Sequence, residues 1–192
     1  MGWTSEEFGD SHEGWTGALL ADGSEPKPVY LDAGSGSHME KTSAWWAYSG
    51  ILNRPVAAQA RAACTCGWRG TRRIELDWDR IGETRPGDFD DSESYEDWSA
   101  HIAEVEARAI PLPAEVTDGL EVLAERLHAL AEQSPTAALR AASALERLAA
   151  DIGRTAAFEI RAEEVPAEAV GEALGLSVTS ARSRVTRYRL RH

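Results

Sequence analysis

Cys64, Cys66 and His101 are the residues whose types and spacing are best suited to binding a metal. One residue separates the two cysteines, a spacing poorly suited to the structural disulfides of secreted domains. Two thiolates on a turn and an imidazole on a helix can hold zinc, but a structural zinc site needs four ligands. The sequence has no obvious fourth ligand. Asp97 or a residue of a second chain could complete the site. The alternative interpretation is a pair of buried thiols beside a hydrogen-bonded histidine.

A second group of residues suited to specific contacts lies near the C-terminus, between Ala167 and Tyr188. Counted from Ala167, apolar or small residues fill positions 4, 5, 8, 10, 12, 15 and 19, as a helix-turn-helix requires. Gly175 allows a positive φ in the turn, and Ser177 can cap the second helix. That helix should expose hydroxyl and guanidinium groups suited to phosphates and base edges: Thr179, Ser180, Arg182, Ser183, Arg184 and Arg187. We therefore expect double-stranded DNA as a partner.

Both groups of residues resemble elements of known families. The stretch from Val165 to Tyr188 resembles the helix-turn-helix of sigma-factor region 4 and of small actinobacterial regulators. Cys64-Thr65-Cys66-Gly67-Trp68-Arg69-Gly70, with Trp98-Ser99-Ala100-His101 after it, resembles a Cys-x-Cys-Gly-Trp element of small, largely uncharacterised actinobacterial proteins. The first resemblance implies transcriptional regulation, whereas the second implies an architecture and no activity.

The charge of the chain is unevenly distributed. The net charge is −12, which by itself discourages contact with a phosphate backbone. Residues 177–192, however, contain five arginines and no acid, so the predicted helix-turn-helix is the one strongly basic patch. A single such module reads too few bases for high specificity, so we expect a homodimer or action together with a partner.

Residues 34–39, Gly-Ser-Gly-Ser-His-Met, have the composition of an engineered flexible linker. They predict that residues 1–33 are an acidic peptide from a partner protein, fused to a protein that begins near Glu40; a natural Gly-Ser turn is the alternative. The peptide has too many apolar anchors for an idle tail: Trp3, Phe8, Trp15, Leu19, Leu20, Val29, Tyr30 and Leu31. The residues expected to bind it are Arg61, Arg69, Arg72, Arg73, Trp45 and Trp46.

The rest of the chain predicts an α+β fold in three parts. Residues 40–112 should form a Trp-rich antiparallel sheet module with one helix, capped by Ser94, over 95–108. Residues 113–162 should form a helical hairpin with helices over 114–132 and 135–162, the second capped by Ser134. In that second helix, arginines at intervals of seven should face water and the opposite apolar side should be packed. Residues 163–192 complete the chain as the helix-turn-helix.

The sequence favours a regulatory function over catalysis. It contains no phosphate-binding glycine loop, no His-Glu-x-x-His and no Gly-x-Ser-x-Gly, so we do not expect an enzyme. No apolar run is long enough for a membrane helix and no signal peptide is evident, so we expect a cytoplasmic protein without a membrane partner. The predicted function is a DNA-binding transcriptional regulator, or an accessory to one, that also binds an acidic peptide. The alternative is a peptide-capturing adaptor in which the helix-turn-helix is purely structural.

Overall fold

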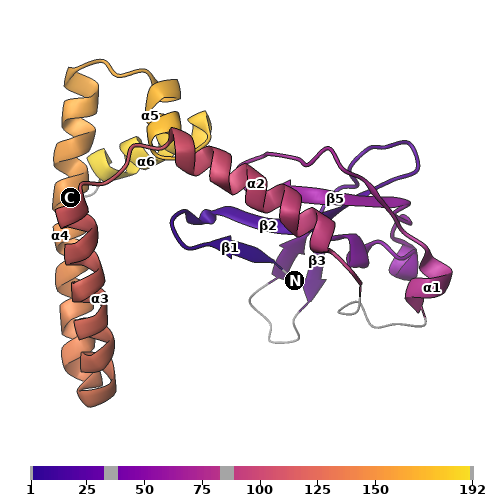
Figure 1. Cartoon of the computed structure of the whole chain (residues 1–192), viewed down its shortest axis with the longest axis horizontal. Helices are drawn as coiled ribbons and strands as arrows, with labels where there is room; N and C mark the ends of the chain where they lie inside the picture. The colour runs from indigo at the N-terminus through magenta and orange to yellow at the C-terminus, as the bar shows by residue number, and fades with distance from the viewer. Residues whose placement is uncertain (1, 33–38, 83–88, 191–192) are drawn as a thin grey trace. The chain divides into compact units, whose positions relative to one another are not determined.

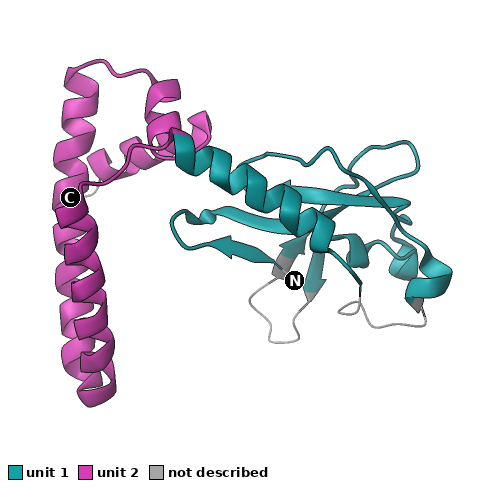
Figure 2. Ribbon diagram, viewed as in Figure 1, with its two compact units in different colours: residues 1–107 teal, residues 108–192 magenta. Residues whose placement is uncertain are grey.

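The computed structural model describes residues 2–32, 39–82 and 89–190, and the chain divides into two compact units (Figure 2). Unit 1 comprises residues 1–107 and unit 2 residues 108–192. The predicted α+β class is confirmed, since unit 1 is built around an antiparallel sheet and unit 2 from helices. Residues 3–32, expected as a fused peptide, supply three strands of unit 1. The linker expected over 34–39 lies, apart from Met39, outside the described residues.

The main sheet of unit 1 has the strand order β1-β2-β5-β6, and every neighbouring pair is antiparallel. Its members are β1 (Trp3–Ser5), β2 (Gly9–Leu19), β5 (Gln59–Cys64) and β6 (Ile74–Glu75). The longest strand, β2, pairs with β5 from Gly14↔Cys64 to Leu19↔Gln59. A separate two-stranded sheet joins β3 (Val29–Asp32) to β4 (Met39–Thr42). The segment 3–32 therefore joins the main sheet through β1 and β2, whereas its third strand, β3, belongs to the separate sheet.

The alternation of residues along β2 and β5 separates the two faces of the sheet. On one face, His12, Gly14, Thr16 and Ala18 of β2 are buried, and Ala60, Ala62 and Cys64 of β5 lie beside them. Two short 3₁₀ turns, η1 (Trp45–Ala47) and η2 (Ile51–Asn53), lie between β4 and β5 in the chain, and a short helix, α1 (Trp78–Gly82), follows β6. The core that includes Ala18 and Ala60 also contains Trp45, Tyr48 and Leu76.

The helix α2 (Ser92–Arg108) covers the other end of this buried face. Trp98 and Ile102 pack against Ala62 and Cys64, as the helical spacing of the apolar residues predicts. Gly14 makes this contact possible, because a Cβ there would lie 2.5 Å from Trp98 Nε1. The predicted cap was wrong: Ser94 lies within the helix, and the Asp90 side chain accepts the Ser92 N–H at the start instead.

Unit 2 consists of a helical hairpin followed by a helix-turn-helix (Figure 1). The hairpin is formed by α3 (Ala114–Gln133) and α4 (Pro135–Ala162), which agree with the predicted bounds to within one residue. Ser134 joins them at the predicted N-cap position, but its side chain makes no capping hydrogen bond. The arginines of α4 are exposed as predicted. The expected packing of the opposite side was wrong, because Leu148 and Ile152 are exposed.

The last two helices are α5 (Ala167–Ala173) and α6 (Val178–Leu190), and α6 packs against α4. Tyr188 lies against Gly153 of α4, where a Cβ would come within 2.4 Å of the aromatic ring. None of the described helices has both the length and the apolar composition needed to cross a membrane.

Candidate metal centre and nucleic-acid interface

Four side chains with metal-binding atoms meet in unit 1. They are His12 from β2, Cys64 from the end of β5, Cys66 from the following turn and His101 from α2. Their ligand atoms all lie within 4.8 Å of one another. Cys64, Cys66 and His101 were predicted as ligands from the sequence, and the structure brings these three together. The fourth position, for which the sequence showed no obvious residue, is filled by His12.

The turn after β5 positions the two sulfur atoms. Gly67 has a φ of +100°, which only glycine adopts without strain, and its N–H donates to the Cys64 carbonyl at 3.0 Å. The tight turn brings the Trp68 N–H to 3.4 Å from Cys66 Sγ, so a backbone donor points at the sulfur. Cys66 is thereby turned back toward the sheet, although Thr65, between the two cysteines, is exposed.

Two sulfur–nitrogen distances within the cluster match those around a tetrahedral zinc ion. Cys64 Sγ lies 3.5 Å from His12 Nδ1, and Cys66 Sγ lies 3.3 Å from His101 Nε2. Zinc bonds of about 2.3 Å to sulfur and about 2.0 Å to nitrogen, at tetrahedral angles, place sulfur and nitrogen about 3.5 Å apart. With all four ligand atoms within 4.8 Å of one another, the residues present suit a Cys₂His₂ site.

The cluster is enclosed by the rest of unit 1. His12, Cys64 and His101 are buried, and Cys66 is partly buried. The Trp68 ring stacks on His101 with ring centroids 4.4 Å apart and planes only 6° apart, and Phe8 lies against His12. These contacts restrict the rotation of both imidazoles, so the ligands are held in place by packing as well as by the backbone.

The two thiols perturb one another. The hydrogen bond with Cys66 lowers the pKa of Cys64 to about 3, with a further contribution from His101. The same neighbouring thiolate raises the pKa of Cys66 above its usual range. One thiolate and one thiol is thus the favoured state of the pair without a cation, and a bound cation favours loss of the remaining proton because thiolates are the metal ligands.

Asp97, considered as a fourth ligand from the sequence, has a different role. Its carboxylate lies 3.4 Å from Arg72 Nε on the surface of unit 1, and it is not a member of the cluster. His12 was missed because its segment was interpreted as a separate peptide. In β2, His12, Gly14 and Thr16 are buried and alternate with the more exposed Glu13 and Trp15.

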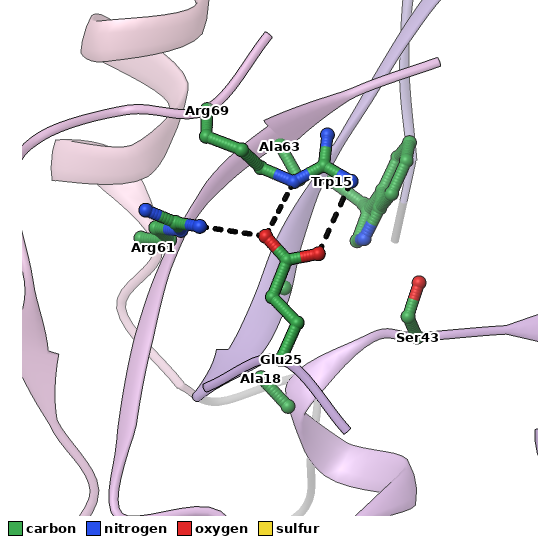
Figure 3. Close-up of a pocket in the computed structure, with 8 residues that line it drawn as sticks. Trp15, Ala18, Glu25, Ser43, Arg61, Ala63 and Arg69 are labelled. Carbon is green, nitrogen blue, oxygen red and sulfur yellow. Dashed lines mark hydrogen bonds and ion pairs between the residues drawn. The ribbon is translucent and has the colours of Figure 1, made fainter. Parts of the chain in front are cut away.

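The other face of the sheet carries a charged cluster around Glu25 (Figure 3). Glu25 Oε1 lies 2.6 Å from both Arg61 Nη2 and Arg69 Nε, and Arg69 Nη2 reaches Oε2 at 3.3 Å. These hydrogen bonds, that of Arg69 first, lower the pKa of Glu25 below its usual value. Arg69 also lies over the Trp15 ring, with its Cζ 5.7 Å from the ring centroid.

The residues expected to bind a peptide are dispersed in unit 1. Arg61 and Arg69 hold Glu25, whereas Arg72 pairs with Glu96 and Asp97 of α2. Arg73 is exposed. Trp45 is buried in the core, while Trp46, with Trp15, Lys41 and Arg69, lines an open groove of 660 Å³.

The expected anchors of residues 1–33 pack at several places in unit 1. Trp3 and Phe8 pack beside Trp98, and Val29 packs on the core around Tyr48. Leu19 is fully buried, whereas Leu20 and Leu31 are partly buried and Tyr30 is exposed.

The helix-turn-helix of unit 2 depends on two glycines. Gly175 has a φ of +61°, as the sequence predicted for the turn. Gly171 is needed for a different reason, since a Cβ there would lie 2.8 Å from the Leu176 carbonyl oxygen. Val170, Gly171 and Ala181 are buried between α5 and α6.

The residues predicted to contact DNA lie on α6. Thr179, Ser183 and Arg187 are exposed, and Arg184 is partly buried. Arg182 is exposed, and its Nη2 lies 3.6 Å from Oε1 of Glu168 in α5. The Ser180 hydroxyl accepts a hydrogen bond from Ser177, whose own oxygen caps the Ser180 N–H, so Ser180 belongs in part to the helix cap.

No protein-family model, curated protein or solved structure matches the chain. Its function must therefore be inferred from the residues themselves.

Proposed function

We propose that this chain is a regulatory protein that binds double-stranded DNA through α6. The observation that carries the proposal is the charge of this helix: Val178–Leu190 contains four arginines and no acid, in a chain of net charge −12. The helix follows α5 after a short turn with a positive φ at Gly175, and in helix-turn-helix proteins the second helix of such a pair enters the major groove. Guanidinium groups bind phosphates and guanine edges, and the exposed hydroxyls of Thr179 and Ser183 can bind phosphates.

The acidic residues of the helix-turn-helix do not lie on α6, the helix proposed to contact DNA. Glu168 and Glu172 belong to α5, and the ion pair of Glu168 with Arg182 joins two exposed side chains. Such exposed pairs are worth little, so Arg182 can exchange this carboxylate for a phosphate at small cost.

The test is a mobility-shift titration of the full chain with a mixed-sequence duplex at two salt concentrations. If about four phosphates are neutralised, raising salt from about 50 to about 200 mM should weaken binding about 150-fold. Replacing Arg182 and Arg184 with alanine should abolish the shift at the higher salt concentration. The matched control replaces Arg140 and Arg147, exposed arginines of α4, and should bind as the wild type does. Equal binding by the α6 variant and the wild type would refute the proposal.

A second candidate function is an adaptor in which the helix-turn-helix is structural. The observation that favours it is the packing of Tyr188 of α6 against Gly153 of α4, which gives α6 a structural role regardless of any ligand. An adaptor of this kind should shift no duplex in the mobility-shift titration, whereas a DNA-binding regulator should shift duplexes in a salt-dependent way.

We also propose that the metal of the Cys₂His₂ cluster is zinc and that its role is structural. Two thiolates with two imidazoles, at the separations of this cluster, suit zinc better than the hard, oxygen-binding cations. Four protein ligands leave no open coordination position for a substrate, which distinguishes this set from catalytic zinc sites. Elemental analysis of protein purified without chelators should find about one zinc per chain, lost when Cys64 and Cys66 are replaced with serine. Protein free of zinc under those conditions would refute the assignment.

A further inference from the structure

The helical hairpin of unit 2 leaves its apolar side uncovered. The helix α3 has no buried residue, and in α4 only Ala157 is buried. Several large apolar side chains of the two helices are exposed, and five of them recur at helical spacing: Val116 46%, Leu120 54%, Leu123 37%, Leu148 55% and Ile152 59%. We name these five residues the hairpin face. Val122, Leu139 and Phe158 are exposed elsewhere on the hairpin.

The five residues form one continuous stripe. In α3, Val116, Leu120 and Leu123 are separated by four and three residues, which places them on one side of the helix. In α4, Leu148 and Ile152 are four residues apart. Because α3 and α4 run antiparallel from Ser134, residues at equal distances from Ser134 lie at the same level. Leu120 and Leu148 are each fourteen residues from it, and Val116 and Ile152 are each eighteen.

Charged residues flank this stripe at Arg126 and Asp151 and otherwise lie away from it. At about 100° per residue, Arg140, Arg147 and Arg154 lie about 80° to 160° around α4 from Leu148 and Ile152. Glu121 and Glu125 lie on the far side of α3 from Leu120 and Leu123 in the same way. A face of this kind is built for burial against other apolar side chains, and two helices alone cannot supply them.

We infer that the hairpin face binds the same face of a second copy of the chain, so that two hairpins form a four-helix bundle. The apolar spacing of four and three is self-complementary, as knobs-into-holes packing requires, and a twofold axis presents the same seam on both sides. From the exposed fractions of its five residues, the hairpin face presents roughly 450 Å² of largely apolar area, within the range of the largest apolar patches of monomers. This is about half of the roughly 800 Å² per partner that a standard interface buries, so the hairpin face supplies the apolar centre of the contact and neighbouring polar residues supply its rim.

The inference has one consequence that depends on the proposed DNA contact. A dimer carries two copies of α6 related by a twofold axis, so its preferred target is a pair of inverted half-sites. The dimer itself does not depend on DNA binding and is tested without DNA.

The test is sedimentation equilibrium of the full chain between about 1 and 50 µM, where a dimer held by such a face should form. The wild type should approach twice the monomer mass of 20.9 kDa. Replacing Leu120 and Ile152 together with lysine should raise the dimer dissociation constant about 100-fold or more, because four charged groups would be placed in an apolar contact. The matched control is Leu139→Lys, also a change of an exposed apolar residue of α4, but on the side opposite the face.

The wild-type mass decides the matter even if the double variant fails to fold. A wild-type mass of 20.9 kDa throughout the concentration range overturns the inference and leaves the face for a different partner. A dimer that the double variant retains also overturns it, because the contact would then lie elsewhere. Loss of DNA binding with an intact dimer would instead count against the proposed function alone.

Discussion

The substitution His12→Asn separates the four-ligand cluster from the three-ligand site visible in the sequence. It removes the imidazole that β2 contributes beside Cys64 and keeps a side chain of similar polarity. Structural zinc sites bind with about 10 to 16 kcal/mol, so one ligand of four is worth about 3 kcal/mol. The affinity for zinc should therefore fall about 150-fold, since each 1.4 kcal/mol is a factor of ten.

The assay is competition for zinc between the protein and a chromophoric chelator at constant pH, with thermal unfolding of the zinc-loaded protein as a second readout. At a fixed concentration of free zinc above both dissociation constants, the variant should lose about 3 kcal/mol of zinc-dependent stability. The control is His128→Asn, which removes an exposed histidine of α3 and should leave affinity unchanged. Wild-type zinc affinity in His12→Asn, with zinc still lost in the double serine variant, would refute the role of His12.

Three further predictions concern packing and charge. Gly14→Ala should destabilise unit 1 by about 1 to 3 kcal/mol, because its Cβ would meet the Trp98 ring. The control is Gly119→Ala, whose Cβ would meet nothing within 4 Å and which should stabilise α3 by up to about 1 kcal/mol. Equal effects of the two substitutions in chemical denaturation would contradict the close contact. Gly171→Ala should lower the free energy of unfolding of unit 2 by about 1 to 3 kcal/mol, measured in the same way, because its Cβ meets the Leu176 carbonyl; an unchanged unfolding midpoint would argue against the tight turn. Glu25→Gln should cost about 1 kcal/mol at pH 7, where the ionised carboxylate holds two arginines. Because its pKa is lowered on folding, this stabilisation is present above the usual glutamate value of 4.5 and is lost as pH falls through the lowered pKa, so the variant and the wild type should converge in acid; a constant difference down to strongly acidic pH would contradict the ion pairs.

The sequence predicted the helices of unit 2 more closely than the sheet of unit 1. The bounds of α3 and α4 follow from apolar residues at steps of three and four, from Ser134 and from Pro135. Gly175 predicted the turn of the helix-turn-helix, because the positive φ that the turn needs is met by a single residue type at a single position. Hydrogen bonds within a helix link residues four apart, so the residues that determine where a helix begins and ends lie close together in the sequence.

Three of the four cluster residues could likewise be chosen from the sequence, because two cysteines in one turn and a histidine on a nearby helix form a recognisable set. What only the tertiary structure decided is the fourth. Cys64 and His12 are 52 residues apart, and the antiparallel pairing of β2 with β5 brings them together. Two paired strands can be separated by very different numbers of residues, so the spacing of residues in the sequence does not indicate which strands pair. The exposure of Leu148 and Ile152 is of the same kind: periodicity determined which side of α4 is apolar, but only the positions of α3 and α6 decided how little of that side the chain itself covers.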